Sequence, residues 1–473
     1  MKKLIFACLV LCLAFCLFGC YNRSKTIKVG TIEEFLNSGA DYNDVIQLTN
    51  DIDFADYEWT PRGIFYLDGN GYSLKNLSME VADGDDIGIF TSFRSIKNVT
   101  FENVSITYYG KGSNIGGIIG KLNDDNNYDF YYLENVKITG KIYAPSASNV
   151  GGVIGYIRDV QPNLKNVEAD IEVTGKDCVG GIVGKIGYAE KLDTLFDQIM
   201  GNSGTKYSTI GINILESTNH GTITSIGECA GGIVGAFYDK SGSINNCNNY
   251  GAINAKTNCG GLAGVAVLSV CNNSLNYGTI TSTMPFDDGN SYAGGIAGQM
   301  LTFNQNVKLL NFGNVNGLSK SVGGICGYII NSTLFECKNT GIIEGEDFVG
   351  GLVGYADGNS QFVLCQNSGD TTANFGSVGG VIGYANNSFV NMSANSGTIY
   401  GKTCAGGIVG KYNASDTNSD GVVVGSTNSG DIISSGFAAG IIGRVEASPL
   451  TDLDTNTNTG VINGNQNDEI ANY

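Results

Sequence analysis

The chain has 473 residues, with 69 glycines, only 5 prolines and a formal net charge of −18. This acidic balance argues against binding to nucleic acid or to anionic lipid through a basic patch. The single histidine, His220, excludes zinc sites built from several histidines and the H-E-x-x-H metalloprotease helix. A Ser-His-Asp catalytic system would have to use His220, which lies inside a repeated Asn-x-Gly turn.

Residues 1–20 have the layout of a secretory signal peptide, because two lysines precede an apolar run that is short for a bilayer span. The run ends in Leu17-Phe18-Gly19-Cys20, which resembles a bacterial lipobox and implies lipidation of Cys20. Phe18 departs from the small or β-branched residue favoured there, so an ordinary cleaved signal and a retained anchor remain open. We expect an exported protein of the cell envelope, facing the exterior or the periplasm and held to the membrane only by acyl chains on Cys20.

Residues 21–60 are predicted to form a polar tether followed by an N-terminal cap. Thr31 and Glu34 are spaced as the N-cap and the reciprocal residue of a capping box, which predicts a short helix over residues 31–36. The apolar residues 45–48 and Trp59 are expected to cover the first strands, because an uncovered end would expose a strand edge. We interpret Trp59 as a structural residue and not as a ligand contact.

From residue 61 to residue 473 the chain is dominated by one internal repeat. A small or apolar residue followed by Gly-Gly-Ile/Val-x-Gly recurs about eleven times, for example at residues 115–120 and 150–155. A second phrase that contains Asn-x-Gly stands between consecutive copies, as at residues 249–251 and 339–341. The apolar segments are short and alternate with a period of two, which indicates strands. The scarcity of proline fits a chain whose backbone is mostly paired.

This repeat predicts an all-β fold, a right-handed parallel β-helix (β-solenoid) with roughly 28 residues per coil. Each phrase is too short to bury its own apolar face, so stability must come from the stacking of neighbouring coils. A leucine-rich solenoid would need a ladder of leucines, and a propeller would need four strands per blade. The sequence has neither pattern.

The phrases Gly-Gly-Ile-Val-Gly at residues 180–184 and Gly-Gly-Leu-Val-Gly at residues 350–354 resemble the GLUG motif. That motif is found in bacterial surface proteins and in the N-terminal region of the zinc IgA peptidases. Residues 67–77 are similar to the segment that often precedes these repeats. The resemblance covers residues 26–464, and it implies a surface-protein repeat without catalytic residues of its own.

Two repeated positions are expected to form buried ladders. The asparagine of Asn-x-Gly is predicted to stack between coils through its side-chain amide. The cysteines that follow Cys20 mostly occupy positions where other copies have a small residue, namely Cys247, Cys337 and Cys365 in one register and Cys178, Cys229 and Cys404 in another. We expect reduced core thiols, while disulfides between adjacent coils, such as Cys337 with Cys365, and a metal site remain alternatives.

The sequence assigns no catalytic, cofactor-binding or metal-binding residue. Two acidic clusters, residues 83–86 and residues 123–129, contain oxygen ligands that could hold calcium and carboxylates that could act in catalysis. Neither cluster has the spacing of an EF-hand or of a calcium-binding β-helix repeat. We therefore interpret both as solvated loops.

Extra residues are expected to leave the rod along one edge, at residues 121–132, 186–213, 299–306 and 411–420. In solenoids the edge with insertions often carries the binding site. Within the longest insertion, the apolar spacing of residues 189–200 predicts a short amphipathic helix that packs on the rod or contacts a partner. Several tyrosines near these loops could stack on sugar rings: Tyr128, Tyr131, Tyr132, Tyr188 and Tyr207.

The sequence favours an exported bacterial cell-surface lipoprotein whose β-helix binds a glycan or protein ligand and is not an enzyme. Two alternatives remain: a carbohydrate-active enzyme of the polysaccharide lyase or glycosidase type that uses acidic residues, and a passive stalk or spacer. We expect no nucleic-acid partner and no cofactor, with calcium as the one alternative. The identity of the ligand and the oligomeric state stay open.

Overall fold

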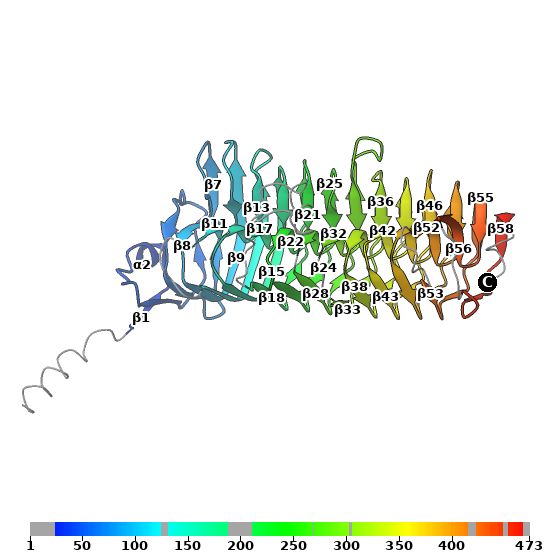
Figure 1. Ribbon diagram of the computed structural model, residues 1–473. Helices are drawn as coiled ribbons and strands as arrows, with labels where there is room; N and C mark the ends of the chain where they lie inside the picture. Colours follow the sequence, from blue (N-terminus) through cyan, green and yellow to red (C-terminus); the bar gives the residue numbers. More distant parts are fainter. Residues whose placement is uncertain are drawn as a thin grey trace, which may run out of the picture.

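The computed structural model shows a long rod of stacked coils, with the short helix α2 at the N-terminal end (Figure 1). The structure describes residues 24–123, 131–187, 211–267, 269–301, 305–414, 422–447 and 453–466. The strands pair in parallel with strands of neighbouring coils, and the rod is a right-handed parallel β-helix. The predicted all-β fold is therefore confirmed. Within the described ranges no helix has the length and apolar character needed to cross a membrane.

One complete coil illustrates the cross-section. It contains, in chain order, β21 (Cys229–Gly231), β22 (Val234–Tyr238), β23 (Ser243–Asn245), β24 (Asn248–Asn249) and β25 (Ile253–Ala255). Along the asparagine positions, neighbouring coils are 27 residues apart between Asn249 and Asn276 and 35 residues apart between Asn276 and Asn311. The predicted length of roughly 28 residues matches the shorter coils, and insertions lengthen the others.

The strand that follows each Gly-Gly pair belongs to a 13-stranded sheet along the rod. Its members in spatial order are β4 (Arg62–Gly63), β8 (Phe90–Ser92), β11 (Ile119–Leu122), β14 (Ile154–Ile157), β17 (Val183–Gly187), β22, β27 (Ala263–Val267), β32 (Ala297–Leu301), β37 (Cys326–Ile330), β42 (Val353–Asp357), β47 (Ile382–Asn386), β52 (Val409–Ala414) and β56 (Ile442–Ala447). From β11 onward the pairs are in register. Equivalent positions therefore form straight rows parallel to the rod axis.

Four further ladders complete the coils. The strands that enter each Gly-Gly pair are β10 (Ile115–Gly116), β13 (Asn149–Gly151), β16 (Cys178–Gly180), β21, β26 (Cys259–Gly260), β31 (Tyr292–Gly294), β36 (Ser321–Gly323), β41 (Phe348–Gly350), β46 (Ser377–Gly379), β51 (Cys404–Gly406) and β55 (Ile432–Ala439). The ladder after the 13-stranded sheet contains β18 (Asn213–Leu215), β23, β28 (Val270–Asn272), β33 (Gln305–Val307), β38 (Thr333–Phe335), β43 (Gln361–Val363), β48 (Phe389–Asn391) and β53 (Val423–Val424). The next contains β19 (Thr218–Asn219), β24, β29 (Leu275–Asn276), β34 (Leu310–Asn311), β39 (Lys338–Asn339), β44 (Gln366–Asn367), β49 (Ala394–Asn395), β54 (Thr427–Asn428) and β57 (Thr457–Asn458).

The last ladder contains β20 (Ile223–Ser225), β25, β30 (Ile280–Ser282), β35 (Val315–Gly317), β40 (Ile343–Gly345), β45 (Thr371–Ala373), β50 (Ile399–Gly401), β55 and β58 (Ile462–Gln466). Three long strands span several of these positions nearer the N-terminus: β9 (Ser95–Tyr108), β12 (Tyr131–Tyr143) and β15 (Pro162–Gly175). The first coils are built from β1 (Thr26–Val29), β2 (Val45–Leu48), β3 (Ile52–Asp53), β5 (Tyr66–Asp68), β6 (Ser73–Lys75) and β7 (Ser78–Val81).

Close packing between coils requires the glycines of the repeat. A Cβ on Gly350 would lie 2.8 Å from the backbone nitrogen of Gly383 in the next coil. A Cβ on Gly351 would lie 2.2 Å from the carbonyl oxygen of Gly380 and 2.3 Å from Asn367 Nδ2. These distances are far shorter than a van der Waals contact, so a side chain would force the coils apart. The Gly-Gly phrase is therefore a packing requirement of the fold.

The asparagine of each Asn-x-Gly turn forms a ladder along the rod. Each Nδ2 except the last donates to Oδ1 of the asparagine in the next coil over 2.7–2.8 Å. The members are Asn219, Asn249, Asn276, Asn311, Asn339, Asn367, Asn395, Asn428 and Asn458. Because every amide points the same way, Oδ1 of the first member, Asn219, is left without a hydrogen-bond partner among the described residues. The predicted structural role of these asparagines is confirmed.

The cysteines that follow Cys20 are all free thiols. Cys337 and Cys365 directly precede the paired strands β39 and β44, so they are neighbours on adjacent coils. Each thiol donates to a backbone carbonyl, Cys337 to Phe335 over 3.6 Å and Cys365 to Leu334 over 3.3 Å. The expectation of reduced core thiols is confirmed, and the disulfide considered for this pair is absent.

The short helix α2 (Ile32–Leu36) forms where the sequence predicts it. Thr31 Oγ1 accepts the backbone N–H of Glu34 at 3.2 Å, as expected of an N-cap. Glu34 Oε2 accepts the N–H of Gly30 at 2.7 Å, one residue before the reciprocal position of a capping box. The helix start is thus stabilised from both sides.

Trp59 is buried at the N-terminal end of the core. Its indole Nε1 donates to the carbonyl oxygen of Ile89 at 2.9 Å, so its polar group is satisfied. Its ring packs edge to face against Phe54 and Phe90, with centroid distances of 5.2 and 6.2 Å. The interpretation of Trp59 as a structural part of the cap is confirmed.

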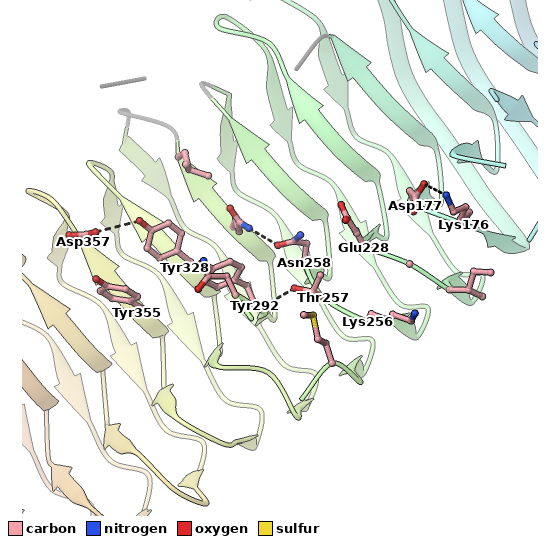
Figure 2. Close-up of a pocket in the computed structure, with 16 residues that line it drawn as sticks. Lys176, Asp177, Glu228, Lys256, Thr257, Asn258, Tyr292, Tyr328, Tyr355 and Asp357 are labelled. Carbon is pink, nitrogen blue, oxygen red and sulfur yellow. Dashed lines mark hydrogen bonds and ion pairs between the residues drawn. The ribbon is translucent and has the colours of Figure 1, made fainter. Parts of the chain in front are cut away.

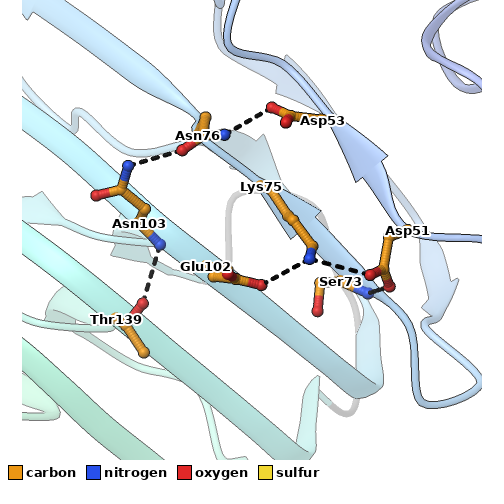
Figure 3. A network of polar contacts seen from close by, with 8 residues as sticks. All are labelled: Asp51, Asp53, Ser73, Lys75, Asn76, Glu102, Asn103 and Thr139. Carbon is orange, nitrogen blue, oxygen red and sulfur yellow. Dashed lines mark hydrogen bonds and ion pairs between the residues drawn. The ribbon is translucent and has the colours of Figure 1, made fainter.

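Polar contacts on the outer surface join the first coils to one another (Figure 3). Lys75 Nζ lies 3.0 Å from Asp51 Oδ2. Asn76 Nδ2 donates to Asp53 Oδ1 at 2.6 Å, and Asn103 Nδ2 donates to Asn76 Oδ1 at 2.7 Å. These contacts connect side chains of successive strands in the same way as the buried asparagine ladder does farther along the rod.

Candidate functional site

Tyrosines from consecutive coils line up on the outer face of the 13-stranded sheet. Tyr328, Tyr355 and Tyr384 are register partners on β37, β42 and β47, so their rings follow the rod axis. Their centroids are 5.3 Å apart between Tyr328 and Tyr355 and 5.0 Å apart between Tyr355 and Tyr384. Tyr292, from β31, adds a ring 5.2 Å from Tyr328. We call these four residues the tyrosine row.

The tyrosine row borders a groove with a volume of about 930 Å³. Tyr292, Tyr328 and Tyr355 line it together with Asp357, whereas Asp177 lies at the opposite end of the same groove (Figure 2). The groove therefore extends across several coils of the rod. A concave site of this size with aromatic walls and a few polar groups is typical of a ligand-binding site.

The tyrosines of the groove are held as neutral phenols. Burial raises the pKa of both Tyr328 and Tyr355, and the nearby carboxylate of Asp357 raises each pKa further. The hydroxyl of Tyr328 donates to Asp357 Oδ2 at 3.4 Å. A neutral phenol offers an apolar ring face and a hydroxyl that donates and accepts hydrogen bonds. This combination suits a ligand that has both apolar faces and hydroxyl groups.

A row of polar side chains runs beside the tyrosine row, two residues farther along the same strands. Asn386 Nδ2 donates to Asp357 Oδ1 at 2.8 Å, and Asn413 Nδ2 donates to Asn386 Oδ1 at 3.1 Å. These side chains share a face with the tyrosines, because alternate residues of a strand point to the same side. We call Asp357, Asn386 and Asn413 the polar row. The sheet therefore presents rings and hydrogen-bonding groups side by side.

A second set of rings, the aromatic column, lies at the Asn-x-Gly turns. It consists of His220, Tyr250, Tyr277 and Phe312, whose centroids are 4.8–4.9 Å apart and whose planes differ by 2–9°. Each ring of this column covers the face of its neighbour and leaves its edge exposed. In the tyrosine row Tyr292 stacks on Tyr328 and Phe348 stacks on Tyr384, with interplanar angles of 27° and 22°. Tyr355 meets its ring neighbours at 55–65°, so its face is not covered by a parallel ring. Tyr355 is therefore the member of the row best placed for a ligand that stacks on a ring face.

The structure places His220 in the aromatic column, 3.9 Å from Glu168 Oε1, and not in the groove. The first acidic cluster, residues 83–86, makes hydrogen bonds to the next coil. Asp85 Oδ1 accepts the N–H of Ser113 at 2.6 Å, and Asp86 Oδ1 accepts from Asn114 Nδ2 at 2.6 Å. These contacts tie residues 83–86 to the next coil. Residues 124–129 of the second cluster lie outside the described residues. In the part of the chain that the structure describes, no group of three or more His, Cys, Asp or Glu side chains is placed to hold a metal ion.

Much of the predicted insertion edge lies outside the described residues, at 124–130, 188–210, 302–304 and 415–421. The helix expected at 189–200 lies outside the described residues, and so do Tyr128, Tyr188 and Tyr207. The expected lipidation site Cys20 also lies outside them. Tyr131 is buried and Tyr132 is exposed. Both line a smaller hollow of about 300 Å³ and not the large groove.

Two carboxylates face the groove from adjacent coils. Asp177 and Glu228 each precede a cysteine of the paired strands β16 and β21, so their backbones are separated by the strand spacing of about 4.8 Å. Asp177 Oδ2 also lies 3.3 Å from Lys176 Nζ. Retaining glycosidases hold their two carboxyl groups about 5 Å apart. Asp177 and Glu228 line the groove from adjacent coils, so they are the two carboxylates whose separation would have to match this value for acid chemistry on a sugar.

The residues of this groove were not predicted from the sequence, although one signal for them is present. The residue after the last glycine of the repeat is tyrosine in three consecutive copies, Tyr328, Tyr355 and Tyr384. Alignment of the repeats in register marks this position as an outward-facing row. The opposite wall has no such signal, because Asp177 and Glu228 lie in turns whose residues differ between copies.

The fold and the groove define a parallel β-helix with a groove along its side. No protein-family model matches the chain, and no solved structure matches it. A stretch of 115 residues is 30% identical to halomucin from Haloquadratum walsbyi (strain DSM 16790 / HBSQ001). This stretch is 24% of the chain, and the chain spans 1% of the length of that curated relative.

Proposed function

We propose that this chain is an exported, lipid-anchored bacterial surface protein whose β-helix binds a glycan in the groove beside the 13-stranded sheet. The tyrosine row carries this proposal, because it places neutral phenol rings next to the amides of the polar row. Sugars combine apolar ring faces with many hydroxyl groups, and such a surface complements both. The likeness of the repeats to GLUG repeats and the lipobox at Cys20 support a location at the cell surface.

Binding can be tested with the soluble form, residues 21–473, on a panel of polysaccharides and matrix proteins, with retention and glycan mass recorded together. We expect retention of at least one glycan without new products. Tyr355→Ala is expected to weaken this binding about tenfold, because it removes a ring with which the sugar stacks. Tyr277→Ala is the matched control, since it removes a 43% exposed ring from the aromatic column. Equal losses in the two variants would contradict the site, and no retention of any ligand would favour a passive stalk.

Anchoring through Cys20 is a separate part of the proposal. In a bacterial host, Cys20→Ala is expected to move the protein from the membrane fraction to the aqueous fraction, because the thiol that would carry acyl chains is gone. Incorporation of a labelled fatty acid gives a second readout, present in the unmodified protein and absent in the variant. Cys178→Ala is the control, since it leaves Cys20 in place. Fatty-acid labelling of the Cys20→Ala protein would show that the anchor lies elsewhere.

The pair Asp177 and Glu228 favours a second candidate function, a carbohydrate-active enzyme. One carboxyl group would protonate the leaving oxygen while the other acts as nucleophile or base. In that case Asp177→Asn and Glu228→Gln would each abolish product formation and leave retention of the glycan intact. If new glycan masses form with the unmodified protein and are absent with both variants, the protein is an enzyme and not only a binding protein.

A further inference from the structure

We infer that the groove binds a linear, uncharged glycan that lies parallel to the rod axis, with successive sugars over successive coils. This inference rests on the proposed function and specifies the class and the orientation of its ligand.

The spacing of the binding surface favours a ligand with the same repeat. Coils are stacked at about 4.8 Å, and the centroids of the tyrosine row follow one another at 5.2, 5.3 and 5.0 Å. A pyranose in an extended chain with equatorial linkages advances by a similar length, so sugars and rings stay in step along the row. A chain with axial linkages winds into a helix and leaves a straight row after a few sugars.

The polar row supplies hydroxyl partners beside Tyr355 and Tyr384 and continues for one coil beyond them. Asp357, Asn386 and Asn413 come from consecutive coils and are joined to one another by hydrogen bonds of 2.8 and 3.1 Å. Their remaining donors and acceptors are held at the coil spacing, in parallel with the rings. A linear chain can therefore make the same pair of contacts, one ring and one amide or carboxylate, on the two consecutive coils that carry Tyr355 with Asp357 and Tyr384 with Asn386.

The length of the groove fits several sugars and not a single one. Its lining begins at Lys176, before β16, and continues through residues next to β21, β26 and β31 to β37 and β42. Tyr384 and Lys411 extend the same outward-facing row beyond the groove, on β47 and β52. Lys411 Nζ lies 5.3 Å from the centroid of the Tyr384 ring, so the row continues without a gap.

The negative charges of the groove and of the whole chain argue against an acidic glycan as the ligand. Asp177, Glu228 and Asp357 line the groove, while of its two lysines Lys176 already pairs with Asp177 at 3.3 Å. The whole chain carries a net charge of −18, so it repels a polyanion at long range. An uncharged, equatorially linked chain is the ligand class that satisfies the spacing, the polar row and the charge together.

The test is calorimetric titration of residues 21–473 with cello-oligosaccharides and chito-oligosaccharides, from the disaccharide to the hexasaccharide. We expect the affinity of at least one series to rise about tenfold or more from disaccharide to hexasaccharide, because a longer chain reaches more of the four rings. Maltohexaose, which is α-linked and helical, is expected to bind at least about tenfold more weakly than the best hexasaccharide.

Tyr384→Ala sharpens the test, because this ring lies beyond the groove and only a long chain reaches it. The variant is expected to lower the affinity for the hexasaccharide and leave the affinity for the disaccharide unchanged. Tyr384→Phe and Tyr277→Ala are expected to retain the wild-type dependence of affinity on chain length. Equal affinity for short and long chains would overturn this inference and leave glycan binding standing. The same conclusion would follow if maltohexaose bound as tightly as the best hexasaccharide. No binding by any oligosaccharide, together with no retention on the polysaccharide panel, would overturn both.

Discussion

Single side chains of the asparagine ladder act on two coils at once. Asn339 accepts from Asn311 and donates to Asn367, and it also donates to the carbonyl oxygen of Gly341 at 2.9 Å. Loss of this buried amide leaves partners in both neighbouring coils unsatisfied. The ladder therefore concentrates stability in the residues that the sequence predicts to stack between coils.

Asn339→Ala is expected to destabilise the surrounding coils by about 2–4 kcal/mol, because it removes hydrogen bonds on both sides and leaves a small cavity. Asn219→Ala is the matched control. It lies at the start of the ladder, where its Oδ1 has no partner among the described residues, so its loss is expected to be smaller. Thermal unfolding followed by circular dichroism measures the difference. Equal shifts in the two variants would show that the ladder does not carry this stability.

The thiols differ in reactivity because their environments differ. The thiol of Cys229, in register with Cys178, hydrogen-bonds to it and lowers the pKa of Cys178, and Lys185 lowers it further. Burial raises the pKa of Cys247 and of Cys271 to about 12. Since the thiolate is the reactive form, neighbouring groups and not sequence position determine which cysteine reacts first.

We expect iodoacetamide at pH 8 to alkylate Cys178 before any other cysteine of residues 21–473, because Cys178 is half-buried and has a lowered pKa. Peptide mass spectrometry over a time course identifies the modified residue. Cys178→Ser removes the fast phase and serves as the control. Alkylation of a core thiol such as Cys247 at the same rate would show that the coils open more readily than the packing indicates.

Among the structural elements, the N-terminal cap has its own chemistry. The backbone N–H of Ser73 and the ammonium group of Lys75 lower the pKa of Asp51, and hydrogen bonds from Asn76 and Ala55 lower the pKa of Asp53. A carboxylate with a lower pKa in the folded state stabilises the fold above its unfolded pKa of about 3.9. That contribution is lost as the pH falls from about 3.9 through the folded-state value.

The cap is therefore expected to unfold in acid before the coils that contain the asparagine ladder. The emission of Trp59, which is the single tryptophan of the chain, reports on the cap and the first coils that it packs against, whereas circular dichroism reports on all coils. Asp53→Asn is expected to reduce the pH dependence of the Trp59 signal and leave the dichroism transition in place. Coincident transitions at every pH would indicate one cooperative unit instead.

Prediction from sequence succeeded for those elements whose residues repeat. The Asn-x-Gly turns and the Gly-Gly phrases recur with similar spacing, and they give the coil and the position of its strands. Thr31 and Trp59 were also placed correctly, because a helix cap and a buried indole have local signatures. The groove was missed, since Asp177 and Glu228 come to line it only when two turns stack in space.

At the scale of the whole molecule, each coil contacts mainly its two neighbours. Deletion of residues 340–367 joins Asn339 to Ser368 and removes one complete coil of 28 residues. We expect this shortened protein to fold with a thermal midpoint close to that of the full rod, because the new neighbours are in register. Deletion of residues 340–353 removes part of a coil, breaks the register and is expected to abolish folding of the coils next to it. Circular dichroism and thermal unfolding separate the two outcomes.

The hydrogen bonds between coils run along the rod axis, and this direction has a mechanical consequence. If the chain is held to a membrane at its first residues and to a glycan at the groove, tension passes through the coils that lie between them. A pull along the axis loads all hydrogen bonds of one coil interface together, so they share the force. The coils beyond the bound glycan, including that of β56, carry none of that load. The rod would then resist traction from its first coils to the glycan and bear no force over the rest.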